Sequence, residues 1–225
     1  MVDVIFNSKS FQMHQLFESD GYSTFCQHVY PSILKNDSGV LHHAAELADI
    51  VAYPQAVSRS FLPAHITTSA VVLSPNRDSC LLLMHKKIGE WVYPGGHADG
   101  DWHLLRSAVR ECFEETGLDE VIVLSTKSGR GPRDWRDVLC PQSVQRFVIK
   151  SYGVVPEHLH YDFVYLLGAR SDLVAHNENE SSAIRWFSES ILRKVAAGRE
   201  GECVDDLDPL TARICINAMQ NARNR

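Results

Sequence analysis

The sequence predicts a mixed β-sheet with helices around it, an α/β or α+β layer architecture. From His65 onward, short β-branched and apolar stretches alternate with turn residues, which is typical of strands. Between and after them, residues 102–116 and 207–223 place apolar side chains at helical spacing. The 225 residues are 44% hydrophobic and 22% charged, values typical of a globular protein with a full core.

Residues 1–60 lack the alternation of a strand and are predicted to form an N-terminal helical extension. Apolar residues recur at helical spacing in residues 10–17 and 39–53, and the turn-prone stretch "KNDSG" separates the two. These segments predict two or three helices. The expected organisation is this extension followed by one domain over residues 61–225.

The remainder of the chain is predicted as a strand pair, a glycine-rich loop, a helix, further strands and two closing helices. The expected strands are residues 65–74, 80–85, 91–94, 120–125, 145–152, 160–169 and 183–187. The expected closing helices are residues 188–198 and 207–223. The helix over residues 102–116 should end at Gly117, which adopts left-handed backbone readily. Asp208 and Pro209 are suited to begin the last helix. Residues 126–142 are expected to form a surface loop or insertion.

Charge, apolar runs and cysteine usage exclude several classes of protein. The net charge is −6 with no long basic run, which argues against binding to extended nucleic acid but not against one nucleotide held with a metal. Apolar runs are far shorter than the roughly 20 residues that span a bilayer, and no secretion signal is evident. The six cysteines form no CxxC pair, so a reduced, cytoplasmic setting is expected.

The helix over residues 102–116 carries Arg110, Glu111, Glu114 and Glu115 close to its end. Carboxylates three and four positions apart share a helix face and repel one another, and the macrodipole disfavours anions there. A hard divalent cation removes the conflict, because Mg²⁺ and Mn²⁺ prefer oxygen ligands. Arg110 is spaced to pair with Glu114. The alternative is a solvated acidic face, which the adjoining glycine loop and arginine make less favoured.

The stretch "GGHADGDWHLLRSAVRECFEETGL" resembles the Nudix box, the signature of the Nudix (MutT-like) hydrolases. Gly96 takes the first glycine position of the box, and residues 110–118 fill its second half at the family spacing. One position departs, because Trp102 occupies the first glutamate slot with Asp101 just before it. Asp101 would then serve in its place or cap the helix. Stretches before and after the box also resemble members of this family, so the resemblance covers about residues 62–195.

The resemblance implies a Nudix-type αβα sandwich and hydrolysis of a diphosphate linkage in a nucleoside diphosphate joined to another group. It implies Mg²⁺ or Mn²⁺ as the cofactor, with one backbone and three side-chain ligands: Gly96, Glu111, Glu114 and Glu115. Diphosphate hydrolysis needs neutralised phosphate oxygens and an activated water, and a bound metal supplies both.

The catalytic set implied by the resemblance is Arg110, Glu111, Glu114 and Glu180. The general base is left open between a glutamate of the box and an acidic residue on a later loop. Glu180 matches the later position, and Glu178 is its close competitor.

His97, Arg133 and Trp135 are the candidate substrate-binding residues. His97 lies in the glycine loop, while Arg133 and Trp135 could pair with and stack on a nucleotide. Eleven histidines suggest zinc, but the pairs "HLH" and "HH" lack the i,i+4 spacing of a helical metal pair. His158 and His160 should share one face of a strand. The alternative for each residue is a structural role, at the surface or hydrogen-bonded within the fold.

Two other functions on the same fold are considered. The first is a non-catalytic nucleotide sensor or binding module, although all the metal carboxylates are present. The second is an isopentenyl-diphosphate isomerase, which needs a histidine-rich metal site and a cysteine before the box, whereas Cys112 lies in the helix. Residues 1–60 could form a lid or a homodimer interface. The group attached to the diphosphate is not indicated by the sequence.

Overall fold

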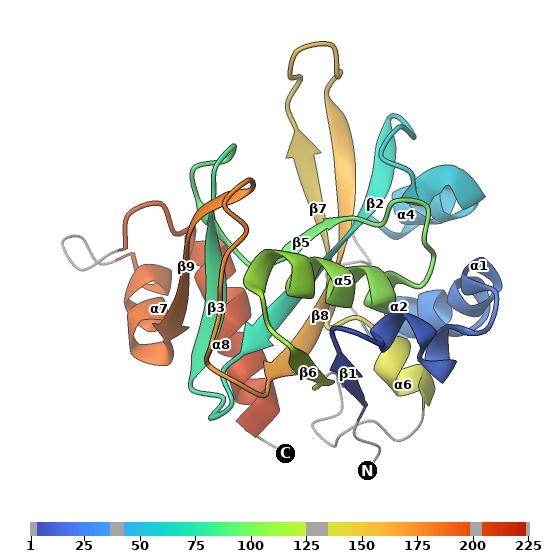
Figure 1. Ribbon diagram of the computed structural model, residues 1–225. Helices are drawn as coiled ribbons and strands as arrows, with labels where there is room; N and C mark the ends of the chain where they lie inside the picture. Colours follow the sequence, from blue (N-terminus) through green and yellow to red (C-terminus); the bar gives the residue numbers. More distant parts are fainter. Residues whose placement is uncertain (1–3, 37–42, 125–134, 199–203, 224–225) are drawn as a thin grey trace.

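The computed structural model describes residues 4–36, 43–124, 135–198 and 204–223. Within them one mixed sheet has helices on both sides (Figure 1). Its strands are β1 (Ile5–Asn7), β2 (Ala64–Leu73), β3 (Ser79–His85), β4 (Trp91–Val92), β5 (Gly95–His97), β6 (Glu120–Val123), β7 (Ser143–Ile149), β8 (His158–Ala169) and β9 (Ser181–Ser188). The main order is β1-β6-β8-β2-β3-β4, with β5 pairing β2, β7 pairing β8 and β9 pairing β3.

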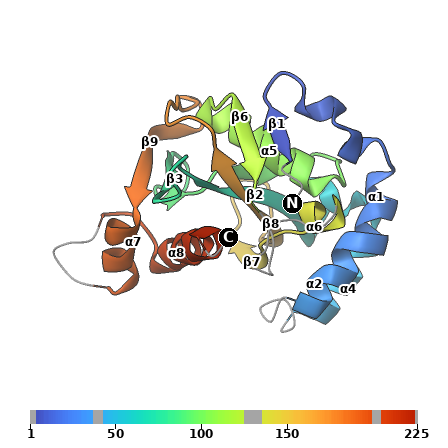
Figure 2. The ribbon, with the colours of Figure 1, turned by 90° about the horizontal axis from the view of Figure 1, so that it is seen from below.

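The helices complete a three-layer arrangement, which confirms the predicted mixed fold class. They are α1 (Gly21–Thr24), α2 (Tyr30–Asn36), α4 (Ala44–Val51), α5 (Leu104–Thr116), α6 (Trp135–Leu139), α7 (Glu189–Ala196) and α8 (Pro209–Arg223), with short 3-10 or π turns at Phe11–Met13, Gln15–Phe17, Phe25–Val29 and Pro54–Val57. Helix α5 and the N-terminal segment lie on one side of the sheet, and α7 and α8 lie on the other (Figure 2). In the described part of the chain, no helix is long and apolar enough to cross a bilayer.

Strands β2 and β8 form the parallel centre of the sheet, with His65 opposite His160 and Thr67 opposite Asp162. Every residue of β2 is buried, because both faces of the strand are covered. Ile66 and Ala70 pack into the core beneath α5, whereas Val71 packs into the core beneath α7 and α8. The register therefore determines which side chains reach each side of the sheet.

Several predicted boundaries are confirmed by local contacts. Gly117 ends α5 in left-handed backbone at a φ of 64°. The Asp208 carboxylate accepts the Thr211 N–H at 2.9 Å, so Asp208 caps α8 as expected. Helix α5 begins at Leu104 rather than at residue 102, because Trp102 is turned into the core and the Asp101 carboxylate accepts the His103 N–H at 2.9 Å.

The N-terminal segment is less regular than predicted. Ile5–Asn7 forms a strand against β6, where an all-helical extension was expected. His14 adopts extended backbone and divides the expected helix over residues 10–17 into two 3-10 turns. Edge pairing with β6 supplies the hydrogen bonds of β1, a long-range contact that local sequence does not encode.

Trp102, which occupies a glutamate slot of the box, joins the N-terminal segment to the start of α5. Its indole is 8% exposed, and its Nε1 donates to the Pro54 carbonyl at 2.7 Å. The ring packs on Tyr22 and Phe25, with centroids 4.8 and 4.9 Å away. The adjacent His103 ring lies 2.8 Å from the Ser19 carbonyl through its Nε2. A carboxylate at position 102 would be buried among aromatic rings.

We predict that Trp102→Ala lowers the free energy of unfolding by about 3 kcal/mol or more, because it leaves a cavity between the N-terminal segment and α5. Trp102→Phe should cost about 1 kcal/mol, since it loses mainly the hydrogen bond to Pro54. Urea denaturation followed by circular dichroism measures both. Leu173→Ala, at a side chain 83% exposed, is the control and should be near neutral. An unfolding free energy for Trp102→Ala equal to that control would contradict the docking role.

Candidate functional site

Helix α5 turns two carboxylates inward against strand β5. The Glu115 carboxylate accepts the Gly95 N–H at 2.8 Å. A Cβ at Gly96 would lie 2.7 Å from the Glu111 carboxyl carbon, so glycine is required for this approach. Glu111 and Glu115 are 8% and 5% exposed. The predicted metal ligands Gly96, Glu111 and Glu115 thus come together at one place on the α5 side of the sheet.

Arg110 connects this pair to the glycine loop. Its Nη1 lies 2.9 Å from Glu111 Oε1 and 3.4 Å from Glu114 Oε2, so the expected i,i+4 pair is present but is the longer of the two. Its Nη2 donates to the His97 carbonyl at 2.9 Å. Glu114 differs from its two partners, because its side chain is 57% exposed. Arg110 therefore orients one buried and one exposed carboxylate and also fixes the end of β5.

The two inward carboxylates are electrostatically costly in the absence of a cation. Burial raises the pKa of Glu111 to about 7, although Arg110 acts in the opposite direction. Burial, together with the nearby charges of Glu111 and Glu180, raises the pKa of Glu115 to about 8, although the hydrogen bond from the Gly95 N–H acts in the opposite direction. Clustered carboxylates that outnumber the one guanidinium beside them, that of Arg110, fit a hard divalent cation such as Mg²⁺ or Mn²⁺.

The later loop brings Glu180, rather than Glu178, to the site. The Glu180 side chain makes a hydrogen bond with Glu115, and its charge acts on Glu111 as well. Glu178 contributes its backbone carbonyl to the Lys86 ammonium. Glu180 precedes β9 directly, and its own carbonyl accepts the Lys86 N–H at 3.0 Å. The loop carboxylate adjoining the box is therefore that of Glu180.

The predicted substrate-binding residues are only partly described by the structure. Arg133 lies outside the described residues, and so does the side chain of Trp135, whose backbone begins α6. The His97 imidazole points away from the α5 carboxylates toward His65 and His160, with ring centroids 5.2 and 5.4 Å away. Its backbone carbonyl, in contrast, takes part in the carboxylate site through Arg110.

The sequence reasoning missed a cluster of histidines. The rings of His65, His97, His158 and His160 gather where β2, β5 and β8 meet. Burial lowers the pKa of His97 to about 4 and that of His160 to about 3, and it also lowers the pKa of His65. The rings of His65, His97 and His160 are therefore neutral near pH 7. The signal in the sequence was the alternating "HLH" of one strand together with a histidine at the start of another, but their parallel register was not predicted.

Among the described residues, no cysteine stands on the strand before α5, where an isomerase would require one. Cys112 is fully buried in α5, and burial raises the pKa of its thiol to about 12. A thiol of this kind is inert rather than reactive. Glycines, Gly95 and Gly96, occupy the strand that precedes the helix.

Comparisons with known proteins identify the family and chains of similar fold. A family model described as the NUDIX domain matches residues 63–207, well over half of the chain. A NUDIX-family hydrolase from Clostridium perfringens is 22% identical, with a TM-score of 0.51, and the match covers 69% of this chain and 96% of the other. A MutT protein from Methanosarcina mazei Go1 is 18% identical over 72% and 97% of the two chains, with a TM-score of 0.45. The E. coli dihydroneopterin triphosphate pyrophosphohydrolase is 16% identical over 68% and 95%, with a TM-score of 0.42.

We predict that Mg²⁺ raises the melting temperature of the wild-type chain, because a cation relieves the repulsion between Glu111 and Glu115. At about 100 times the dissociation constant, the added stability should be about 2.7 kcal/mol. Differential scanning calorimetry with Mg²⁺ or EDTA measures the effect. Glu115→Gln should lose most of the Mg²⁺ increment, whereas Glu157→Gln, which alters an exposed carboxylate, should retain it. Equal increments in both variants would show that the cation binds elsewhere.

Proposed function

The chain belongs to the Nudix family, and from this premise we propose that it is a metal-dependent hydrolase of a diphosphate linkage. The substrate class we propose is a nucleoside diphosphate joined to another group. The observation that carries the proposal is the inward pair Glu111 and Glu115, held against Gly95 and Gly96 and oriented by Arg110. A stability role accounts poorly for two adjacent carboxylates that are both buried.

We propose Glu111, Glu114, Glu115 and the Gly96 carbonyl as the groups that hold Mg²⁺ or Mn²⁺. The donor set fits such ions, because every candidate ligand atom is an oxygen. When bound, the ion would neutralise phosphate oxygens and lower the pKa of a coordinated water. The exposure of Glu114 supports a role for it as the third carboxylate, on the side of the pair that a substrate from solvent would reach.

The chain's own groups would position the reactants and move a proton. Arg110 holds the Glu111 carboxylate and the His97 carbonyl, which keeps the helix and the loop in fixed relation. Glu180 adjoins Glu115 and is our choice of general base, with Glu114 of the box as its competitor. In the reaction, water oxygen bonds to phosphorus, the bridging P–O bond breaks, and the base takes the water proton.

Substrate recognition, location and assembly remain proposals. Arg133 and Trp135 are retained as groups that pair with and stack on the nucleotide. His97 is retained near the phosphates only through its backbone, which Arg110 contacts, because its ring points away from the α5 carboxylates. A cytoplasmic location rests on cysteine usage alone. For homodimer formation the proposed interface is residues 1–60, with a lid over the site as the alternative role of that segment.

We predict that Glu114→Gln or Glu115→Gln lowers kcat for diphosphate hydrolysis by about 100-fold or more while the fold survives, because each removes a charged metal ligand. Phosphate or nucleotide release at saturating Mg²⁺ or Mn²⁺ measures it, and Glu157→Gln is the control. Near wild-type turnover in both variants would make the metal assignment wrong.

A panel of nucleotide sugars, ADP-ribose, dinucleoside polyphosphates and nucleoside triphosphates, each with Mg²⁺ and Mn²⁺, tests the enzyme assignment itself. We expect hydrolysis of at least one class. Tight nucleotide binding with no turnover across the panel would favour the alternative of a non-catalytic sensor.

A further inference from the structure

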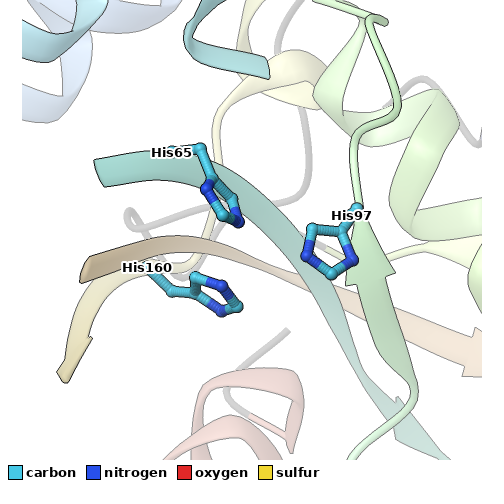
Figure 3. Close-up of side chains that lie close together, drawn as sticks. All are labelled: His65, His97 and His160. Carbon is cyan, nitrogen blue, oxygen red and sulfur yellow. The ribbon is translucent and has the colours of Figure 1, made fainter. Parts of the chain in front are cut away.

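Strand register places the histidine cluster on the side of the sheet opposite the carboxylate site. His65 lies directly across from His160 on the parallel strands, and His97 lies across from Thr67, two residues after His65. Alternation along β5 then turns the His97 ring to one side, while the neighbouring Gly96 faces Glu111 on the other. Figure 3 shows the rings of His65, His97 and His160 turned toward a common space.

The three rings are spaced for a shared ligand. One ring nitrogen from each of His65, His97 and His160 lies within 4.8 Å of the other two. Tetrahedral zinc with N–Zn bonds of about 2.05 Å separates its nitrogens by about 3.3 Å, so a modest inward rotation of the side chains completes the geometry. His65 and His160 lie opposite each other on β2 and β8, and His97 lies on β5, which pairs with β2, so strand pairing restricts the positions of all three backbones.

Hydrogen bonds to the rings determine which ring nitrogens carry protons, and so leave other ring nitrogens with lone pairs that can bind this ligand. His65 Nδ1 lies 3.2 Å from the Phe61 carbonyl, an acceptor only, so Nδ1 carries the proton. His65 Nε2 is left as a lone pair; His65 is 1% exposed, and this nitrogen has no hydrogen-bond partner within the described part of the chain. Metal-binding histidines usually donate their second ring nitrogen to a carbonyl in this way.

His158 supports the third ring. Its Nδ1 lies 2.9 Å from the Pro156 carbonyl and therefore carries a proton, which leaves Nε2 as an acceptor. That Nε2 lies 3.1 Å from His160 Nε2, so His160 donates to it and keeps its Nδ1 lone pair. Further along the same face of β8, the Asp162 carboxylate accepts the Thr67 hydroxyl at 2.9 Å.

We propose that His65, His97 and His160 bind a divalent transition-metal ion of the zinc type, at a site separate from the oxygen-lined site of α5. Imidazole nitrogens select such ions, whereas Mg²⁺ requires oxygen ligands. Three histidines leave a fourth position open to water or to a substrate atom. The two sites share strand β5, because His97 binds one ion through its ring and contacts Arg110 through its carbonyl. The proposal does not depend on hydrolysis.

The test is zinc binding in the presence of excess Mg²⁺, measured by isothermal titration and by metal analysis after gel filtration. We expect the wild-type chain to retain zinc at a one-to-one ratio. His160→Asn and His97→Asn, at partly exposed rings, should each weaken binding by more than about 100-fold, because loss of a ligand exceeds loss of a supporting group. Co²⁺ substitution should give the intense visible absorption of a tetrahedral site in the wild type and not in these variants.

Two matched variants make the outcome decisive. His43→Gln changes a histidine that pairs with Glu46 outside the cluster and should leave zinc binding unchanged. Glu115→Gln alters the carboxylate site and should also leave it unchanged. Melting in EDTA checks that every variant is folded. Failure of the wild-type chain to retain zinc, zinc retained by both His160→Asn and His97→Asn, or zinc lost in Glu115→Gln would each overturn the proposal.

Discussion

The site depends on one close approach, that of helix α5 to strand β5. The Gly95 N–H holds the Glu115 carboxylate, and only a glycine at position 96 leaves room for Glu111. Both carboxylates are buried, burial raises the pKa of each, and the charge of Glu180 acts on both in the same direction. Such an arrangement is unfavourable for an unliganded interior and favourable for a bound cation. The glycines, the helix register and Arg110 all serve to maintain it.

The N-terminal segment contributes to the same helix from its other end. Trp102 replaces the glutamate that the Nudix box carries at this position, and it gives the segment a buried aromatic anchor at Tyr22 and Phe25. Asp101 stabilises the start of the helix, because its carboxylate accepts the His103 N–H and forms an ion pair with Arg106 at 2.7 Å. The departure from the family pattern is thus explained by packing, since a tryptophan here fastens residues that precede the family domain.

Features that depend on residues close together in the sequence could be predicted, whereas features that depend on the register between distant strands could not. The end of α5 at Gly117, the cap at Asp208 and the pairing of Arg110 with Glu114 follow from local spacing. Strand β1 and the histidine cluster depend on long-range pairing of strands. His65 and His160 are far apart in sequence and become neighbours only through the parallel pairing of β2 with β8. Each histidine viewed alone favoured an ordinary role, and only the shared face of the sheet gives them a common one.

The central claim is that the inward carboxylates of α5 hold a divalent cation. The most direct measurement is an anomalous difference map from a crystal soaked in Mn²⁺, collected above the manganese absorption edge. We predict a peak in contact with the Glu111 and Glu115 carboxylates, beside the Gly96 carbonyl, and its loss in Glu115→Gln crystals. A saturating soak that leaves this position without a peak, or that places manganese only among the histidines, would contradict it.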